Sequence, residues 1–581
     1  MAETDTETAA SGQQGLKKKE VVLPVEGRRN VLVTSALPHL GNLVGCVLSA
    51  DVYASYCRLR GDNVLFVCGT DEYGTATETR AMEERCSPRE ICDRYHAVHR
   101  EVYEWFGVSF DHFGRTSSPQ QTEICHDIFR KLLDNSWLSE NTIQQLYCNS
   151  CQRFLADRLV EGSCPTKGCS YDSARGDQCK KCGELLNSIE LIHLYRFHNV
   201  VTLVPGKNQP NSGSGFPFLC STAAILQVCG SAPCVRDTDH LFLELPLLKE
   251  TLERYIQEAS ADGSWSQNAV NATNAWLKGG LRPRCITRDL KWGVPVPHEK
   301  CSMSGLTHQL GTSECYTPEW SKWWKNPDNV ELYQFTGKDN VPFHTVMFPS
   351  TLLGTGDNWT LLKAISVTEY LNYESGKFSK IRVLESLAMM HQIRNSLGHW
   401  ADLQAKLNNE LVNILGNFIN RVLSFIAKPE GAGYGSIIPD APHAESHART
   451  QEISETVGKL VEQYIDAMNK VKLKRGLKLA MALSKEGNAY LQGSKFWELY
   501  KQDPVGCATV IKTSIGLVYL LACLLEPFMP SFSKEVLHQL PPEEHLLFCD
   551  GKGQREKKKA LGSYTIRPQD RETYTSIQKI G

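Results

Sequence analysis

The sequence predicts an α/β fold in which a parallel sheet is interrupted by a cysteine-rich insertion and followed by a helical domain. Three observations predict it. Apolar strand-like runs alternate with helical periodicity near the start of the chain, closely spaced cysteine pairs follow, and the last third carries apolar residues at helical spacing. With 581 residues, 41% of them hydrophobic, the chain is long enough for two to four domains with ordinary cores.

The first element pair is a strand followed by a helix. Asn30–Ser35 predicts a buried strand, and Leu43–Arg60 predicts a helix with a small-residue face. The turn between them contains His39, Gly41 and Asn42, at the place where open α/β sheets bind ligands and where a helix N-terminus favours phosphate. His39 and Asn42 could therefore donate hydrogen bonds to a nucleotide triphosphate. The alternative is an ordinary turn with a capping asparagine and a satisfied histidine.

Two further strand ends carry charged loops. Asn63–Cys68 predicts a second strand that runs into an acidic pair, Asp71 and Glu72, which suits an amino-acid ammonium group. Ile365–Tyr373 predicts a third strand. The basic, glycine-containing loop that follows at Glu374–Arg382 could stabilise a transferring phosphoryl group or a leaving pyrophosphate. Solvated charged loops are the alternative in both places.

Three cysteine pairs mark the insertion. Their spacings are C-x-x-C, C-x4-C and C-x-x-C, and thiolates on such short loops are what tetrahedral zinc requires. Because no secretory pattern opens the chain, metal binding is favoured over disulfides. The pairs are Cys148 with Cys151, Cys164 with Cys169, and Cys179 with Cys182.

Charge and hydropathy limit the partners. The formal net charge of −2 predicts that a nucleic-acid partner must be met by local basic patches. The most apolar run, Thr509–Leu525, contains Lys512 and ends at Glu526-Pro527, so we expect a buried helix and no membrane span. The polar N-terminal segment predicts a disordered tail.

The C-terminal third predicts helices with one apolar and one polar face. Leu411, Ile414 and the apolar residues that follow recur at helical spacing, while Asn417 lies on another face with Arg421. Asparagine and arginine can hydrogen-bond to exposed base edges, and Trp497 is a candidate for stacking on a base. A solvated polar face and a core tryptophan are the alternative.

Two of these loops carry signatures that resemble class I aminoacyl-tRNA synthetases. His39-Leu40-Gly41-Asn42 matches the His-φ-Gly-His/Asn signature, and Lys377-Phe378-Ser379-Lys380 matches the lysine-loop signature up to its last serine. The stretches GTDEYGTATETRA, CITRDLKWGVPVP, ELYQFTGKDNVPFH and TEYLNYESGKFSK are more closely similar to methionyl-tRNA synthetases of the eukaryotic cytosol, those of plants above all.

The resemblance implies a doubly wound, Rossmann-like catalytic domain with a zinc-knuckle insertion, followed by an α-helical bundle that binds the anticodon. It implies ATP-dependent activation of methionine and transfer of the methionyl group to methionine tRNA. The implied divisions are a tail at 1–28, the first catalytic half at 29–145, the insertion at 146–285, the second half with the lysine loop at 286–400, the bundle at 401–550 and an irregular tail at 551–581.

The resemblance also implies roles for individual residues. The catalytic set is His39, Asn42, Lys377 and Lys380. The ATP-binding set is His39, Gly41, Asn42, Lys338, Asp339 and Lys380. The methionine-binding set is Leu37, Asp71, Arg288 and His344. The anticodon set is Asn417, Arg421 and Trp497.

The implied ligands are ATP with Mg2+, L-methionine, methionine tRNA and zinc, in the cytosol and away from membranes. A multi-synthetase or accessory tRNA-binding partner is left open. The first zinc site would be Cys164, Cys169, Cys179 and Cys182. The second would be Cys148, Cys151 and Cys229, with Leu226 where a fourth cysteine is expected and Cys234 as a substitute.

Several segments depart from the family pattern. The turn before His39 is about six residues shorter than in the family, and the segments 193–227, 301–314 and 381–400 and the tail after about Gly553 have an unfamiliar sequence. Ser302–Thr312 resembles the family's peptide read one base out of phase. An alternative is therefore a catalytically dead remnant, or the translation of a disrupted gene, that retains zinc and tRNA binding.

A third possibility is a related class I enzyme for leucine, isoleucine or valine. Those enzymes usually carry a large editing insertion, and Tyr147–Arg284, filled by cysteine loops, leaves little room for one.

Overall fold

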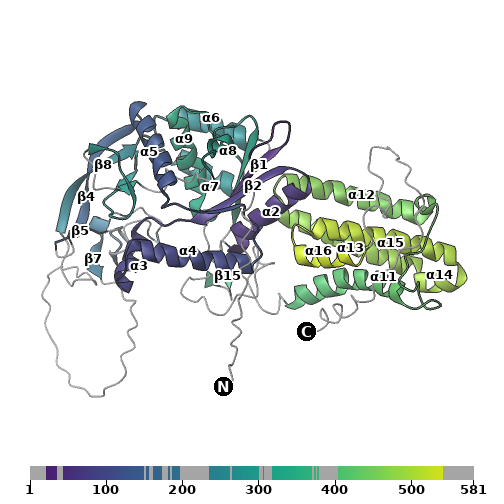
Figure 1. Cartoon of the computed structure of the whole chain (residues 1–581). Helices are drawn as coiled ribbons and strands as arrows, with labels where there is room; N and C mark the ends of the chain where they lie inside the picture. The colour runs from purple at the N-terminus through teal and green to yellow at the C-terminus, as the bar shows by residue number, and fades with distance from the viewer. Residues whose placement is uncertain are drawn as a thin grey trace, which may run out of the picture.

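The computed structural model shows an α/β part and a helical bundle lying side by side (Figure 1). The two parts share a continuous apolar core, described below. The described residues are 21–35, 43–149, 152–155, 161–172, 174, 179, 181–182, 186, 188–195, 234–261, 265–299, 305–306, 317–368, 372–373, 376–377 and 404–540.

A five-stranded, all-parallel sheet forms the centre of the α/β part. The strand order is β14-β13-β1-β2-β3, so the chain starts in the middle, moves to one edge, and returns to fill the other. This is the predicted doubly wound topology. The strands are β1 Asn30–Ser35, β2 Asn63–Thr70, β3 His112–Arg115, β13 Val330–Gly337 and β14 Leu362–Thr368.

Helices cover both faces of the sheet because alternate residues of each strand are apolar on opposite faces. Val31 and Val33 of β1 belong to one buried cluster and Leu32 to another. The helices and helical turns of this part are η1 Leu43–Val47, α2 Leu48–Leu59, α3 Thr75–Glu84, α4 Pro88–Trp105, α5 Pro119–Asp134, α6 Lys249–Ser260, α7 Gln267–Lys278, α8 Ser321–Trp324, η6 Lys338–Asn340, η7 Phe343–Met347 and α9 Phe348–Thr355.

The insertion between β3 and β13 is built on a long antiparallel pair. β4 (Leu138–Cys148) and β8 (Cys234–Leu243) pair along their length, and the cysteine loops extend from the end of this ribbon. The remaining short elements are β5 Arg153–Phe154, β6 Glu161–Ser163, η3 Ser188–Glu190, β7 Ile192–Tyr195, β9 Arg284–Cys285, β10 Thr287–Arg288, β11 Val294–Pro295 and β12 Gly305–Leu306.

The helical bundle is centred on α15 (Pro504–Leu525). This helix is long and apolar enough to cross a membrane by length and composition, but most of it is buried among its neighbours, as predicted for a core helix. The other elements are η10 Leu407–Gly416, α11 Asn417–Ala427, η11 Ala444–Ser446, α12 Ala448–Asn469, α13 Leu473–Ser494, α14 Phe496–Gln502 and α16 Pro530–His538.

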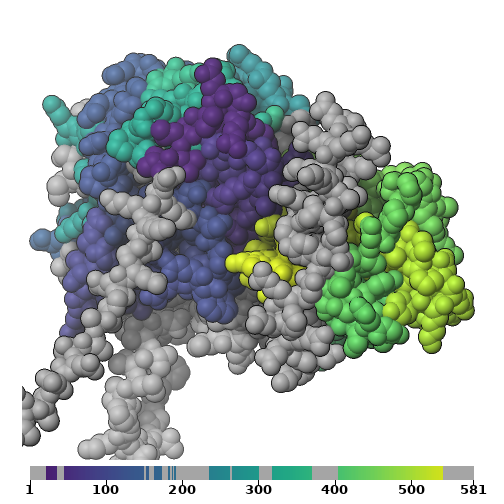
Figure 2. Space-filling view, turned by 45° about the vertical axis from the view of Figure 1, so that its right-hand side comes forward, coloured from purple at the N-terminus to yellow at the C-terminus, as the bar shows by residue number. Residues whose placement is uncertain are grey.

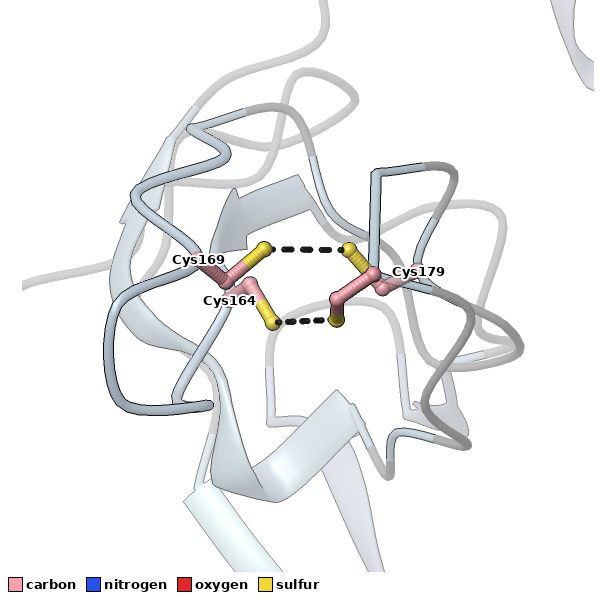
Figure 3. A group of neighbouring side chains, drawn as sticks. Cys164, Cys169 and Cys179 are labelled. Atoms are coloured by element: carbon pink, nitrogen blue, oxygen red, sulfur yellow. Dashed lines mark hydrogen bonds between the residues drawn. The ribbon is translucent and has the colours of Figure 1, made fainter.

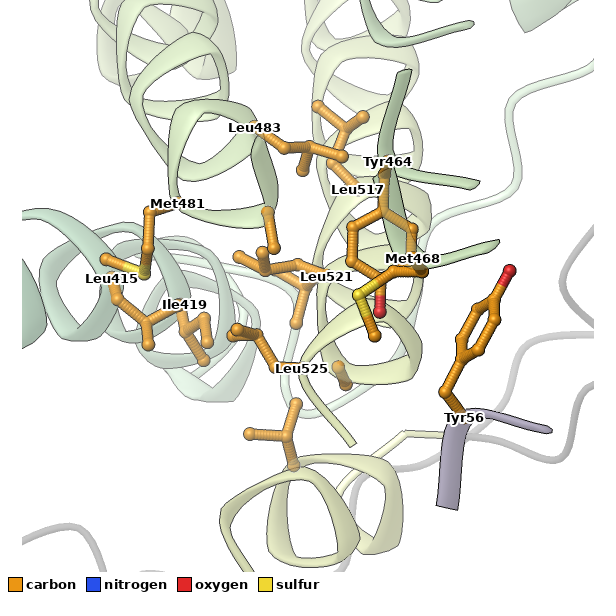
Figure 4. Close-up of a cluster of buried hydrophobic side chains, with 14 of the residues drawn as sticks. Tyr56, Leu415, Ile419, Tyr464, Met468, Met481, Leu483, Leu517, Leu521 and Leu525 are labelled. Atoms are coloured by element: carbon orange, nitrogen blue, oxygen red, sulfur yellow. The ribbon is translucent and has the colours of Figure 1, made fainter. Parts of the chain in front are cut away.

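The bundle packs directly against α2. In Figure 2 the yellow C-terminal end of the bundle lies against the purple-to-blue first part of the chain. The Tyr56 ring lies edge-on to Tyr464 at 6.3 Å, and its hydroxyl donates to Oδ1 of Asn469 at 2.8 Å. Figure 4 shows Tyr56 facing Tyr464 and Met468 at the border of the bundle core. A single apolar cluster therefore runs from the sheet through α2 into the bundle.

Two predicted elements differ in detail. The predicted helix at Leu43–Arg60 begins with a π-helical turn, η1, before α2. The predicted strand at Ile365–Tyr373 begins earlier, at Leu362, and ends at Thr368. Further along, β15 (Asn372–Tyr373), at the end of the predicted strand, pairs antiparallel with β16 (Gly376–Lys377), which lies within the predicted loop.

Candidate functional site

The strand order reverses between β1 and β13, which are parallel neighbours in the sheet. From this point the chain winds in opposite directions, and ligands of open α/β sheets bind outside the carboxyl ends of the strands there. Ser35, the last residue of β1, is the register partner of Phe335, and β13 continues two residues further, to Gly337. The segments that leave this edge begin at residues 36, 71, 338 and 369.

The loop after β2 places Asp71 and Glu72 in different surroundings. Asp71 is half-buried at the edge, whereas Glu72 turns inward and is 2% exposed. Oε1 of Glu72 accepts hydrogen bonds from Nε of Arg115 at 2.7 Å and from the Thr70 hydroxyl at 2.9 Å, and Oε2 accepts one from the Ser117 hydroxyl. Of the predicted acidic pair, Glu72 is therefore an internal structural group, and Asp71 is the half-buried acid directly beyond the strand end.

The backbone of Glu72 is held as firmly as its side chain. Its N–H donates to the Thr116 hydroxyl at 2.9 Å, and its carbonyl accepts from the Trp292 indole N–H at 2.7 Å. The Arg115 that pairs with Glu72 also pairs with Asp93 at 2.6 Å. Buried and hydrogen-bonded at each polar group, this residue fixes the course of the loop that carries Asp71.

The segment after β13 supplies three predicted residues. Lys338 and Asp339 are exposed in η6, directly beyond the strand end. His344 follows in η7, and its Nδ1 donates to Oε1 of the buried Gln334 at 2.7 Å. Because Gln334 offers an acceptor, the proton is on Nδ1 and the ring orientation is fixed.

Arg288 lies on β10, after the insertion. Its side chain is exposed, and Nη1 donates to the Thr287 carbonyl at 3.0 Å. The neighbouring Asp289 turns inward, where Nε2 of the fully buried His240 approaches it at 3.2 Å and the Thr238 hydroxyl donates to it at 2.9 Å. Asp289 anchors the segment with Arg288 much as Glu72 anchors the loop with Asp71.

The first turn of helix after β1 is in close contact with the end of β14. A Cβ atom on Gly45 would lie 1.9 Å from Cγ2 of Thr368, so glycine is required there. The contact fixes the direction in which the chain leaves the segment 36–42. The predicted residues Leu37, His39, Gly41 and Asn42 lie in that segment, outside the described residues.

Part of the lysine loop and of the second cysteine set also lies outside the described residues. Lys377 is on β16, where the backbone alone is described. Lys380, Cys151 and Cys229, together with the atypical segments at 196–227, 307–314 and 381–400, are not described.

Four cysteines from the insertion converge (Figure 3). The Sγ atoms of Cys164, Cys169, Cys179 and Cys182 all lie within 4.8 Å of one another. Two of these separations are 3.8 Å, for Cys164 and Cys182, and 3.6 Å, for Cys169 and Cys179. Four sulfurs each about 2.3 Å from a tetrahedral zinc ion would be about 3.8 Å apart, so the donor set fits the metal.

The thiols of this cluster differ in acidity: burial and the neighbouring thiols raise the pKa of Cys169 to about 12, whereas the pKa of Cys179 is lowered. Backbone N–H groups of Cys182 and Lys181 lower the pKa of Cys179 to about 6. The Thr166 hydroxyl lies 3.3 Å from Sγ of Cys164 and 3.8 Å from Sγ of Cys182. Among the described residues this is the one group of three or more His, Cys, Asp or Glu side chains with metal-binding geometry.

Cys148 and Cys234, at the end of the β4–β8 ribbon, do not share a face. Cys234 is the register partner of Tyr147, so its side chain lies on the face opposite to that of Cys148. Its Sγ lies 3.6 Å from the Tyr147 carbonyl. Cys234 is therefore not placed to substitute for a ligand beside Cys148.

The bundle brings the three predicted anticodon residues together. Asn417 and Arg421 are one turn apart on α11 and share a face. The Arg421 guanidinium lies 5.9 Å from the centre of the Phe496 ring, and Phe496 packs edge-on against Trp497 at 5.3 Å. Trp497 is 41% exposed, which a core tryptophan would not be.

Two side chains of α13 orient Arg421 by accepting hydrogen bonds from its guanidinium group. Oδ1 of Asn488 accepts from Nη1 of Arg421 at 3.5 Å, and Oε1 of Gln492 accepts from Nη2 at 3.3 Å. The Asn488 amide also donates to the Ile414 carbonyl at 2.9 Å, in the π-helix η10.

Sequence reasoning missed four residues with a clear place around the site: Trp292, Arg115, Asn488 and Gln492. Each acts through partners more than 20 residues away, so no local spacing could signal it.

Comparison with family models gives two matches. The model described as tRNA synthetases class I (M) matches residues 31–197 and 221–395. The model described as the anticodon binding domain of methionyl tRNA ligase matches residues 438–559. Together these matches cover both parts of the molecule.

Individual relatives agree. The chain is 62% identical to a probable methionine–tRNA ligase of Oryza sativa subsp. japonica, over 92% of this chain and 68% of that protein. It is 60% identical to the cytoplasmic methionine–tRNA ligase of Arabidopsis thaliana, over 90% of this chain and 66% of that protein. The chain thus spans about two thirds of the length of these relatives.

The fold is shared with a solved structure. A Mycobacterium tuberculosis methionyl-tRNA synthetase in complex with methionyl-adenylate aligns with a TM-score of 0.64 at 17% identity, over 88% of this chain and 94% of that chain. From the family models and the plant relatives, we conclude that the chain belongs to the class I methionyl-tRNA synthetases, the methionine–tRNA ligases.

Proposed function

We propose that the carboxyl edge of the sheet binds ATP and methionine together and catalyses the two reactions of a methionine–tRNA ligase. In the first, a methionine carboxylate oxygen attacks the α-phosphorus of ATP, giving methionyl-adenylate and releasing pyrophosphate. In the second, a hydroxyl of the terminal tRNA ribose attacks the methionyl carbonyl and AMP leaves. The observation that carries the proposal is the topology, which leads the segments bearing Asp71, Lys338 and His344 from one sheet edge.

The amino-acid half of the site is proposed as follows. Asp71 pairs with the methionine ammonium, since it is the half-buried acid directly beyond the strand end while Glu72 is engaged internally. His344, with its ring fixed by Gln334, lines the pocket. Arg288 and Leu37 complete the set. No protein nucleophile is needed, because orientation of the two substrates supplies the catalysis.

The nucleotide half is proposed to consist of His39, Gly41 and Asn42 at the turn, Lys338 and Asp339 beyond β13, and the lysine loop. Lys377 and Lys380 would neutralise the charge that develops on the phosphates in the transition state. A Mg2+ ion accompanying ATP would supply further positive charge to the same oxygens.

The helical bundle is proposed to bind the anticodon of methionine tRNA. Asn417 and Arg421 offer hydrogen-bond groups to base edges, and the exposed ring of Trp497 offers a stacking surface. We propose the cytosol as the site of action, in line with the name of the Arabidopsis relative. A multi-synthetase or accessory tRNA-binding partner is a further proposal.

We also propose that the four-cysteine cluster holds one structural zinc ion. Measuring the metal content of the purified chain tests this. We expect about one zinc per chain, lost in Cys179→Ser and retained in Cys125→Ser, which changes a buried cysteine of α5 outside the cluster. Equal zinc content in both variants would refute the site.

The amino-acid site is tested with two matched substitutions on one strand and its loop. Asp71→Asn removes the proposed ammonium partner, and Asp62→Asn alters an acid near the opposite end of β2, where it pairs with Arg29 at 2.8 Å. In methionine-dependent ATP–pyrophosphate exchange, we expect Asp71→Asn to raise the KM for methionine at least tenfold and Asp62→Asn to leave it unchanged. Equal effects of the two would contradict the assignment.

A further inference from the structure

Trp292 joins two segments of the site that are distant in sequence. It follows Arg288 by four residues in the loop between β10 and β11. Its indole N–H donates to the Glu72 carbonyl at 2.7 Å, and its backbone N–H donates to Oε1 of Glu78 at 2.7 Å. One residue thus ties the loop after β2 and the start of α3 to the segment after the insertion.

The Trp292 ring is fixed on its faces as well. Tyr73 packs against it with ring centres 5.5 Å apart, and the Arg89 guanidinium lies 5.0 Å from its centre. The same Arg89 donates to the Ser117 hydroxyl at 2.7 Å, which in turn donates to Glu72. The half-buried indole is therefore held by the polar network that also immobilises Glu72.

Asp71 directly precedes Glu72, the residue whose carbonyl accepts the hydrogen bond from Trp292. Glu72 is anchored on its other side by its N–H, which donates to the Thr116 hydroxyl. A displacement of the Glu72 peptide would move Asp71 with it, and it would also change the spacing between Asp71 and the segment with Arg288.

We propose that Trp292 is a positioning residue that sets the place of Asp71 relative to Arg288 and thereby the affinity for the amino-acid substrate. The proposal rests on the proposed role of Asp71 in binding the methionine ammonium. The ammonium takes no part in the bond changes at the carboxylate and the α-phosphorus, so its binding contributes equally to the ground state and the transition state. Loss of positioning should therefore raise the KM for methionine and leave kcat unchanged.

The main variant is Trp292→Phe, which removes the indole N–H and keeps an aromatic ring beside Tyr73. A hydrogen bond of this kind is worth about 0.5–1.5 kcal/mol, so the KM for methionine should rise about 2- to 12-fold. The KM for ATP and kcat should stay within about twofold of wild type. The control is Trp276→Phe, in a half-buried tryptophan of α7 that lies beneath Arg284.

Thr116→Val is the second variant. It removes the hydroxyl on the other side of Glu72 with little change of shape, so it should raise the KM for methionine in the same way. If Trp292→Phe destabilises the protein and lowers its thermal midpoint, Thr116→Val still tests whether the position of Glu72 controls the KM for methionine.

Hydrogen exchange of the amides at 71–78 provides a readout that needs no activity. We expect faster exchange in Trp292→Phe than in Trp276→Phe. If amide hydrogen exchange at 71–78 and the KM for methionine are both unchanged in Trp292→Phe, the proposal is overturned. A loss of kcat of the same size for every substrate would also overturn it. If the wild-type chain shows no methionine-dependent exchange of pyrophosphate, the proposed function fails, and amide exchange alone then decides whether Trp292 holds the loop.

Discussion

The sheet edge and the anticodon face of the bundle hold their candidate residues in opposite ways. At the sheet edge, the loop with Asp71 is fixed by an ion pair between the buried Glu72 and the half-buried Arg115. On the bundle, Arg421 and Trp497 are partly exposed, and Arg421 is held by two long hydrogen bonds from α13.

The difference matches the proposed ligands. A small charged substrate requires a group fixed in place before it arrives, and burial strengthens the interactions that fix it. An RNA loop presents bases that can be unstacked and approached, so exposed planar groups on a rigid helix are sufficient. Substitutions of the buried residues that fix the sheet-edge loop should therefore lower stability, whereas those on the bundle face should act mainly on tRNA binding.

The largest difference in stability should come from replacing an arginine by methionine in each region. Arg115→Met leaves the buried Glu72 carboxylate without its closest cation, so we expect the free energy of unfolding of the α/β part to fall by about 3–5 kcal/mol. Arg421→Met, on the bundle face, should cost less than about 1 kcal/mol. Urea denaturation measures both. Equal losses in the free energy of unfolding would contradict the proposed difference between the two regions.

A glycine pair tests the packing beside the turn. Gly45→Ala would place a methyl group 1.9 Å from Thr368 Cγ2, so overpacking should cost about 1–3 kcal/mol. Gly458→Ala, in α12, meets no atom within 4 Å and should stabilise the chain by about 0.5–1 kcal/mol through helix propensity. Thermal midpoints should therefore shift in opposite directions, and a shared direction would argue against the close contact at Gly45.

Trp497→Ala should change tRNA affinity and leave stability intact. A base stacked on an aromatic side chain is worth about 1–3 kcal/mol, so we expect binding of methionine tRNA to weaken by about 5- to 150-fold. The thermal midpoint and the KM for methionine should not move. Filter binding at fixed salt measures the affinity, and an unchanged Kd would remove Trp497 from the interface.

The smallest effect should be a pH dependence of the α/β part. Burial lowers the pKa of His96, His99 and His112 below the ordinary value of 6.5. The unfolded chain therefore binds protons more readily than the folded chain, so stability is fully present above pH 6.5 and is lost as the pH falls through and below it. His99→Phe should flatten this loss in urea denaturation between pH 7.5 and pH 5.5. A loss of the same size in the variant would refute the assignment.

Sequence alone could predict the elements whose signals are local. β1 has the predicted bounds and β2 runs two residues further than predicted, because a run of apolar residues between turns is a property of the segment itself. Spacing predicted that the cysteine pairs suit zinc, and the family resemblance implied which four cysteines form the first set, whose Sγ atoms converge. The fold class followed from the same local patterns and from the family signatures.

Long-range contacts decided what the sequence could not predict. Asp71 and Glu72 are equivalent in a local reading, and Arg115, 43 residues away, separates their roles. The π-helical turns at η1 and η10 also had no local signal. The predicted partnership of Cys148 with Cys234 does not fit because strand register, which pairs Cys234 with Tyr147, is set along the whole ribbon.

Methionine-dependent ATP–pyrophosphate exchange by the purified full chain tests the central claim most directly. If the loops at the sheet edge assemble one crevice for ATP and methionine, the chain will exchange labelled pyrophosphate into ATP when methionine is present and not when leucine, isoleucine or valine replaces it. A folded chain that retains zinc and binds methionine tRNA but gives no exchange would contradict this account and favour the non-catalytic alternative.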